Sequence, residues 1–146
     1  MIKRMLIRIS VFALAALVGM MVVPVRWDCG GIVHGTLFDG RGGFTYTSCT
    51  SSDSSLLTYG HEGYVTAAKA HQVFEQRVRE AVTVIERNEK LDANGNKIGE
   101  RAVTIRFNPE RNRNYASVFW VDERIVSFVD STSLKYALQH EGVLDR

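Results

Sequence analysis

The sequence predicts an α+β protein in which one N-terminal transmembrane helix precedes a small antiparallel sheet, in the order ββαβββα, with one long helix covering the sheet. Three observations predict this fold. An uncharged apolar stretch stands near the N-terminus, an amphipathic segment follows at 65–90, and alternating segments typical of strands flank it on both sides. We expect a sheet of about five strands.

The N-terminal stretch has the layout of a membrane anchor. Three basic residues lie among the first eight, and Ile9–Val25 then runs without a charge. As a helix this segment reaches roughly 25 Å, and the stems of Arg8 and Arg26 extend the reach to the head groups. Basic residues before the span keep the N-terminus in the cytoplasm. We therefore expect residues 1–26 to be an uncleaved signal-anchor in a bacterial inner membrane, and residues 27–146 to be a periplasmic domain.

A cleaved secretory signal is the main alternative, because it shares the basic start and the short apolar core. The residues at the end of the apolar stretch argue against cleavage, because 24–28 contain no pair of small residues at the spacing of a cleavage site. Ala13 and Ala15 have that spacing but lie inside the apolar core. Secretion after cleavage, and a buried helix of a cytoplasmic fold, remain the other interpretations.

Charge argues against nucleic acid as a partner. The chain has a net charge of +2, but residues 1–26 hold four of the 18 basic residues and no acidic one. The predicted exported part is therefore slightly acidic, and the basic excess belongs to the topology signal.

Cys29 and Cys49, the two cysteines of the chain, both follow the anchor. In an oxidising compartment they would form a disulfide that closes a loop of about 20 residues and contributes about 3 kcal/mol. Two free buried thiols are the alternative interpretation. A metal site at this pair would lack further ligands nearby.

The first half of the exported part predicts a hairpin, a loop and a helix. Ile32–Phe38 and Phe44–Cys49 alternate as strands around a glycine-rich turn. Residues 50–63 read as a polar loop with a short tethering strand at Leu56–Tyr59. Val65–Lys90 predicts the long helix. Its apolar stripe contains Ala70, Val73, Phe74, Val78, Ala81, Val82 and Ile85.

The second half predicts three strands and a final helix. The strands are Arg101–Phe107, Ala116–Val121 and Arg124–Val129, and the second is apolar enough to be covered on both faces. Ser131 or Ser133 would cap the helix, which would end at about Glu141 before Gly142. Leu134 and Leu138 would face the core.

No catalytic, cofactor-binding or metal-binding set is predicted. Asp92–Gly99 resembles the start of a calcium loop, but Lys97 and Val103 stand where glycine and glutamate are required, so a turn is the better interpretation. The four histidines, His34, His61, His71 and His140, show no ligand spacing, and the serines lie in no nucleophile motif.

The loop at 108–114 is the best candidate for partner contact. Arg111, Arg113 and Tyr115 suit an acidic or phosphate-bearing partner. Our leading hypothesis is a non-enzymatic binding or accessory module that contacts a larger envelope or membrane protein assembly. The alternatives are a phage or mobile-element exclusion factor, a structural subunit of a membrane complex, and an envelope-acting enzyme with a site between the glycine-rich turn and the serine-rich loop.

Overall fold

The computed structural model describes residues 24–37 and 42–144. Within these residues the chain forms eight strands and two helices. The elements in chain order are β1 (Trp27–Cys29), β2 (Val33–Thr36), β3 (Gly43–Ser51), β4 (Leu56–Gly63), α2 (Ala67–Arg79), β5 (Thr83–Leu91), β6 (Lys97–Asn108), β7 (Arg113–Asp122), β8 (Ile125–Ser131) and α3 (Leu134–Leu144).

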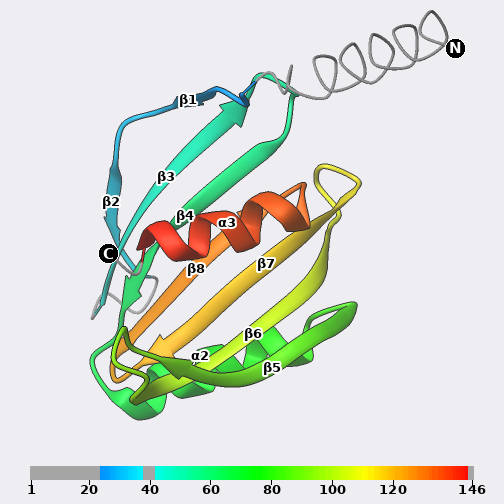
Figure 1. The fold of residues 1–146 in the computed structure, drawn as a ribbon. Helices are drawn as coiled ribbons and strands as arrows, with labels where there is room; N and C mark the ends of the chain where they lie inside the picture. The colour runs from blue at the N-terminus through cyan, green and yellow to red at the C-terminus, as the bar shows by residue number, and fades with distance from the viewer. Residues whose placement is uncertain (1–23, 38–41, 145–146) are drawn as a thin grey trace, which may run out of the picture.

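All eight strands belong to one antiparallel sheet, shown in Figure 1. The strand order is β1-β3-β4-β8-β7-β6-β5, and β2 pairs with β3 beyond the end of β1. The chain thus builds one half of the sheet from β1 to β4 and the other half from β5 to β8. The β4–β8 pairing joins the two halves.

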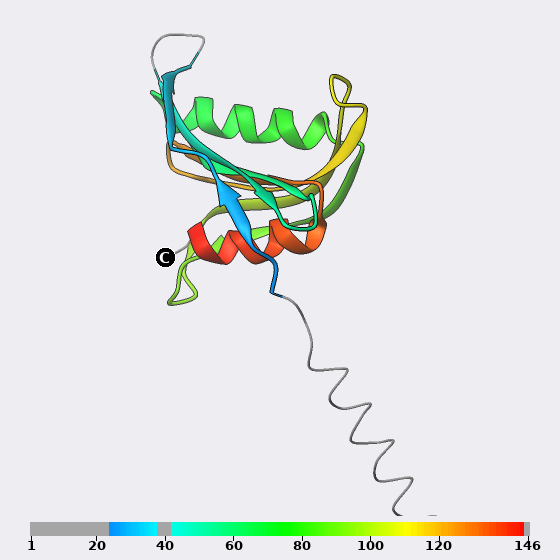
Figure 2. The ribbon, with the colours of Figure 1, turned by 90° about the horizontal axis from the view of Figure 1, so that it is seen from above.

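The two helices cover opposite faces of the sheet, as the view in Figure 2 shows. On the α2 face, Phe74 of the helix packs with Phe119 and Phe128 of the central strands. On the α3 face, Ala137 packs with Val118, Trp120 and other buried side chains. Each helix buries a separate apolar cluster, so the sheet is the middle of three layers.

β7 confirms the expectation of a strand covered on both faces. Val118 and Trp120 point to the α3 face, and Phe119 and Val121 point to the α2 face. All four are buried. Its apolar run is therefore the consequence of a central position between two helices.

The predicted order ββαβββα is wrong, and so is the expectation of one covering helix. The helix expected at 65–90 ends at Arg79, and β5 begins at Thr83. Thr66 caps the helix, its hydroxyl accepting the Lys69 N–H at 3.1 Å. Residues 82–85 are β-branched throughout, which favours a strand over a helix. Val82 and Ile85, assigned to the apolar stripe, are exposed.

The segment at 50–63 also differs from the prediction. β4 occupies most of it as an inner strand paired with β3 and β8, and the polar turn shrinks to residues 52–55. The final helix lies where it was expected but runs through Gly142 to Leu144. Its buried residues are Ala137 and Glu141, whereas Leu134 and Leu138 are exposed.

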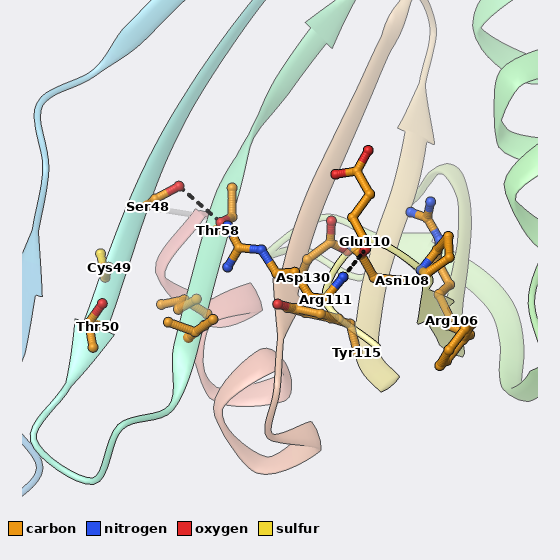
Figure 3. Close-up of a pocket in the computed structure, with 14 residues that line it drawn as sticks. Ser48, Cys49, Thr50, Thr58, Arg106, Asn108, Glu110, Arg111, Tyr115 and Asp130 are labelled. Atoms are coloured by element: carbon orange, nitrogen blue, oxygen red, sulfur yellow. Dashed lines mark hydrogen bonds between the residues drawn. The ribbon is translucent and has the colours of Figure 1, made fainter. Parts of the chain in front are cut away.

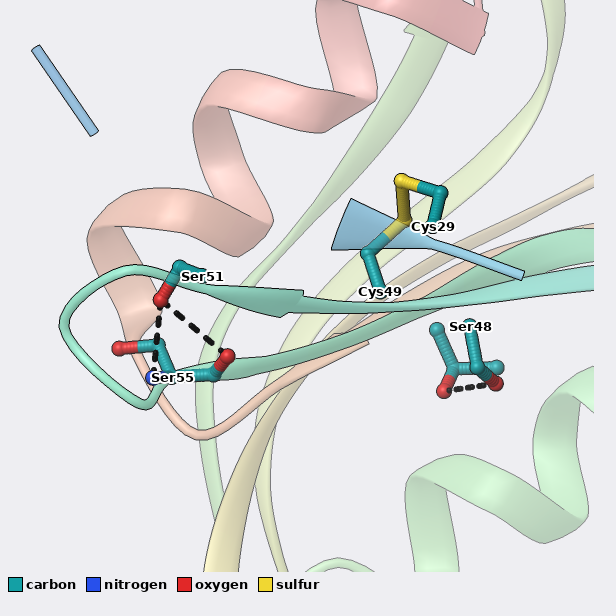
Figure 4. The surroundings of a disulfide bond; sticks show 6 residues. Cys29, Ser48, Cys49, Ser51 and Ser55 are labelled. Carbon is teal, nitrogen blue, oxygen red and sulfur yellow. Dashed lines mark hydrogen bonds between the residues drawn. A yellow bond between two sulfur atoms is a disulfide. The ribbon is translucent and has the colours of Figure 1, made fainter. Parts of the chain in front are cut away.

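The predicted disulfide is present, between directly opposed residues of β1 and β3. Figure 4 shows Cys29 and Cys49 on the α3 side of the sheet. The residues just before Cys29 are held on the α3 side of the sheet as well. Trp27 packs edge-on against Tyr136, with ring centroids 5.1 Å apart, and the Arg26 carbonyl accepts the Ser52 N–H at 2.9 Å.

The predicted anchor, residues 1–26, lies almost entirely outside the described residues. Of the two helices that are described, α2 and α3, neither has the length and hydropathy that a membrane crossing requires.

Candidate functional site

The α2 helix covers only part of its face of the sheet. Beyond it, a row of polar side chains crosses five neighbouring strands at matching register positions. The row consists of Ser48, Thr58, Asp130, Ser117 and Thr104. Ser48 and Thr58 share a hydrogen bond of 3.0 Å, and Ser117 donates to the Asp130 carboxylate. These two cross-strand pairs satisfy their polar groups locally, whereas the buried Thr104 hydroxyl has no hydrogen-bond partner among the described residues.

A cavity of about 650 Å³ is lined by Ser48, Thr58 and Asp130 of this row, whereas Ser117 and Thr104 are fully buried and lie outside its lining. The loop between β6 and β7 forms one wall, and the ends of β3 and β4 form the opposite side (Figure 3). The side chains that carry charge at the cavity are Arg106, Glu110, Arg111 and Asp130. The volume lies in the range of small-ligand and short-segment sites.

The loop at the wall is built by two asparagines. The Asn108 side-chain oxygen accepts the Arg111 N–H at 3.2 Å, which closes the turn. Asn112 adopts a φ of 47°, a left-handed conformation that asparagine tolerates better than most residues. The turn directs the Arg111 side chain back over the sheet toward Thr58 (Figure 3).

The cavity combines two guanidinium groups with hydroxyls and carboxylates. Arg106 stands on β6, opposite Tyr115 in the β6–β7 register, and Arg111 stands on the loop. A guanidinium offers a planar set of donors that matches a carboxylate or phosphate. Asp130 accepts from Ser117 on one side and borders the cavity on the other. The lining therefore offers two cationic and two anionic side chains beside its hydroxyl groups.

The structure brings together two of the three residues predicted for partner contact. Arg111 and Tyr115 line the cavity, whereas Arg113 begins β7 as an exposed residue outside the lining. The sequence pattern missed Arg106, Asp130 and the Ser48–Thr58 pair. Arg106 and Asp130 could have been found from the sequence, because each is a charged residue on a half-buried face of the sheet, where charges are uncommon.

The four histidines lie away from this cavity. His61 is on β4 and bonds Ser127 at 2.7 Å, and burial lowers its pKa. His140 lies on α3 between Trp27 and Tyr59, where burial likewise lowers its pKa. His71 is on α2 beside Glu75. His34 is on β2, paired with Thr45.

The serine-rich turn, proposed above as part of an enzyme cleft, is closed by its own side chains. Asp53 accepts hydrogen bonds from Ser51, Tyr136 and Ser55, which hold the pKa of its carboxyl well below the ordinary range. Ser54 adopts a φ of 65° within this turn. These contacts fasten the turn to α3 and use the polar groups structurally.

The predicted turn is present at residues 92–96, and β6 begins at Lys97. The Asp92 carboxylate accepts the N–H groups of Asn94 at 2.8 Å and Asn96 at 2.9 Å, which lowers its pKa. Gly95 supplies the positive φ, at 83°. The described residues contain no group of three or more histidine, cysteine, aspartate or glutamate side chains placed to hold a metal ion.

Comparison of the chain with models of known protein families, with curated proteins and with solved structures finds no match.

Proposed function

We propose that this protein is a membrane-anchored periplasmic binding module, which engages an acidic segment of another envelope or membrane protein in the cavity over the α2 face. The single observation that carries the proposal is that Arg106 and Arg111 both line one cavity of about 650 Å³. Both are positioned by backbone structure, one by a strand and one by an Asn-capped turn.

The sequence of the N-terminal region supports the membrane part of the proposal. Its basic start and charge-free stretch are typical of a signal-anchor, and the disulfide is typical of a domain on the oxidising side. Trp27, directly after the proposed anchor, packs on Tyr136 of α3, so the start of the domain is held by a structured contact.

The binding part of the proposal is supported by the charges and the shape of the cavity. A carboxylate that reaches the Arg106 or the Arg111 guanidinium would form charge-assisted hydrogen bonds, which are roughly twice as strong as neutral ones. The hydroxyls of Tyr115 and Thr58 line the same cavity and are suited to the backbone polar groups of a bound segment. Leu56 and Pro109 add apolar contact at its sides.

Site-specific photo-cross-linking in intact membranes tests the proposal. The full chain would carry a photoreactive amino acid at Tyr115, in the cavity, or at Gln139, an exposed position of α3 that serves as the control. We expect one envelope or membrane protein to be captured from Tyr115 and not from Gln139. Adding Arg111→Glu should remove the product, because the reversed charge repels an acidic segment.

Two results would overturn the proposal. The first is a cross-link that persists unchanged with Arg111→Glu and with Arg106→Glu, which would place the contact outside the cavity. The second is the same product from Tyr115 and Gln139, which would mark it as nonspecific.

A further inference from the structure

β5 is the outer strand of the sheet and pairs, among the described residues, with β6 alone. Eight of its nine residues are exposed. The segment also carries exposed apolar side chains, with Val84, Ile85 and Leu91 each between 44% and 48% exposed. An exposed edge strand of this length and composition is a template for pairing with another strand.

The charges of β5 are complementary to those of the same strand running in the opposite direction. Between two shifts in the β5–β6 register, the regular part of β5 is Glu86–Lys90. Antiparallel pairing of two copies centred on Asn88 places Arg87 opposite Glu89 of the second copy, and Glu86 opposite Lys90. Each pair occurs twice by symmetry, and Ile85 meets Leu91 beyond each end.

Neighbouring registers lack this complementarity. A two-fold axis that relates two antiparallel strands runs midway between the two copies of one residue, so that this residue faces its own copy. Centring on Arg87, Glu89 or Lys90 places like charges face to face, and centring on Glu86 does the same. Directly opposed like charges destabilise a strand pair, whereas opposite charges stabilise it. Asn88 is the charge-neutral centre of the regular stretch.

We propose that β5 binds β5 of a second copy of this chain, which joins the two sheets into one across a two-fold axis at Asn88. Arg87 and Glu89 form the more accessible of the two charge pairs, although Arg87 also binds Glu75 and Glu100 of its own chain. The Arg87 and Glu89 side chains are 40% and 61% exposed, and both lie on the α2 side of the sheet. Lys90 contributes less, because its ammonium is buried against Glu141.

The symmetry is compatible with two copies anchored in one membrane. A two-fold axis perpendicular to the sheet keeps both α3 helices on the same side. Trp27 of each copy packs on α3, so the first strands of both domains are held on that side. This compatibility rests on the proposed function, whereas the dimer itself rests on β5.

Sedimentation of the full chain in detergent micelles tests the proposal. We expect a dimer for the natural protein and at least about a tenfold weaker dimer for Glu89→Arg, because the substituted arginine then faces Arg87 at both symmetric positions. Lys97→Glu is the matched control. It removes the same Glu89–Lys97 ion pair of 3.1 Å but leaves the β5 sequence intact, so its dimer should match the natural one within about twofold.

A cysteine at the proposed axis gives an independent readout. Asn88→Cys should form a disulfide-linked dimer in membranes under mild oxidation, because the two residues at a strand-pair axis are direct neighbours. Lys69→Cys, exposed on α2, should not. A natural chain that stays monomeric to about 100 µM would overturn the proposal. So would a Glu89→Arg dimer of undiminished affinity, or equal cross-linking from positions 69 and 88.

Discussion

Lys90 and Glu141 form an ion pair of 3.1 Å that ties the edge strand β5 to the last helix α3, 51 residues further along the chain. Arg101 of β6 binds the same carboxylate with two nitrogens, at 2.6 and 2.8 Å. The Lys90 ammonium also lies 4.3 Å from the centre of the Trp120 ring. One carboxylate therefore joins two strands and a helix on the α3 face.

We predict that Glu141→Ala lowers the free energy of unfolding by about 3 kcal/mol, because it removes the buried carboxylate that two cations share. Urea denaturation of the full chain in detergent measures the change. Gln139→Ala, at an exposed position of the same helix, is the control and should change stability by less than about 0.5 kcal/mol. Equal stability of the two variants would contradict this account of the α3 face.

Because of the Glu141 carboxylate, we also predict that the stability of the protein depends on pH. Burial alone raises the pKa of Glu141, but the hydrogen bonds and charges of Arg101 and Lys90 outweigh it and lower the pKa below the ordinary 4.5. Folding therefore favours the ionised form. Its contribution is present above about pH 4.5 and is lost as pH falls through the lower pKa of the folded state.

We expect the stability difference between the natural chain and Glu141→Gln to be largest near neutral pH and to shrink toward about pH 3. Parallel urea titrations of the two proteins at several pH values provide the measurement. A difference that stayed constant over this range would mean that Glu141 does not act through its charge.

Replacing both cysteines by serine should cost about 3 kcal/mol, since the bond constrains a loop with a sequence separation of 20 residues in the unfolded chain. Thermal or urea unfolding with and without reductant measures it. Reductant should destabilise the natural protein to the level of the double variant and leave the variant unchanged. A natural protein insensitive to reductant in the unfolding range would refute the prediction.

Two glycines should respond to alanine in opposite directions. A Cβ at Gly99 would lie 1.7 Å from the Val121 carbonyl oxygen, so Gly99→Ala forces the β6 and β7 backbones apart and should cost at least about 2 kcal/mol. A Cβ at Gly142, inside α3, meets nothing within 4 Å. Gly142→Ala should therefore stabilise the protein by about 0.5–1 kcal/mol. Thermal unfolding of both variants tests the contrast.

The sequence predicted most of the strands, the final helix and the disulfide. It failed where the apolar spacing typical of a helix continues into a segment that forms a strand. Residues 65–85 keep apolar side chains at steps of three and four beyond the real end of α2 at Arg79. No glycine or proline separates α2 from β5. The β-branched residues 82–85 were the local signal for a strand, and extending the apolar stripe across them merged two elements into one.

Only the part of the cavity that the loop forms was predicted from the sequence. Arg111 and Tyr115 are close in sequence, so a local pattern predicted their proximity. Ser48, Thr58 and Asp130 come from three strands, and their alignment depends on the long-range β3–β4 and β4–β8 registers. The sequence predicts a loop with a short strand where β4 lies, so the predicted fold has no place for the half of the site that β4 carries.

The central claim is that an uncleaved N-terminal segment holds a disulfide-closed domain on the far side of the membrane. Intact-mass measurement of the protein from membranes, after thiol alkylation without reductant, tests it most directly. We predict the mass of a chain that retains residues 1–26 and carries no alkyl group on Cys29 or Cys49. A mass that begins near Trp27, or two alkylated cysteines, would contradict the claim.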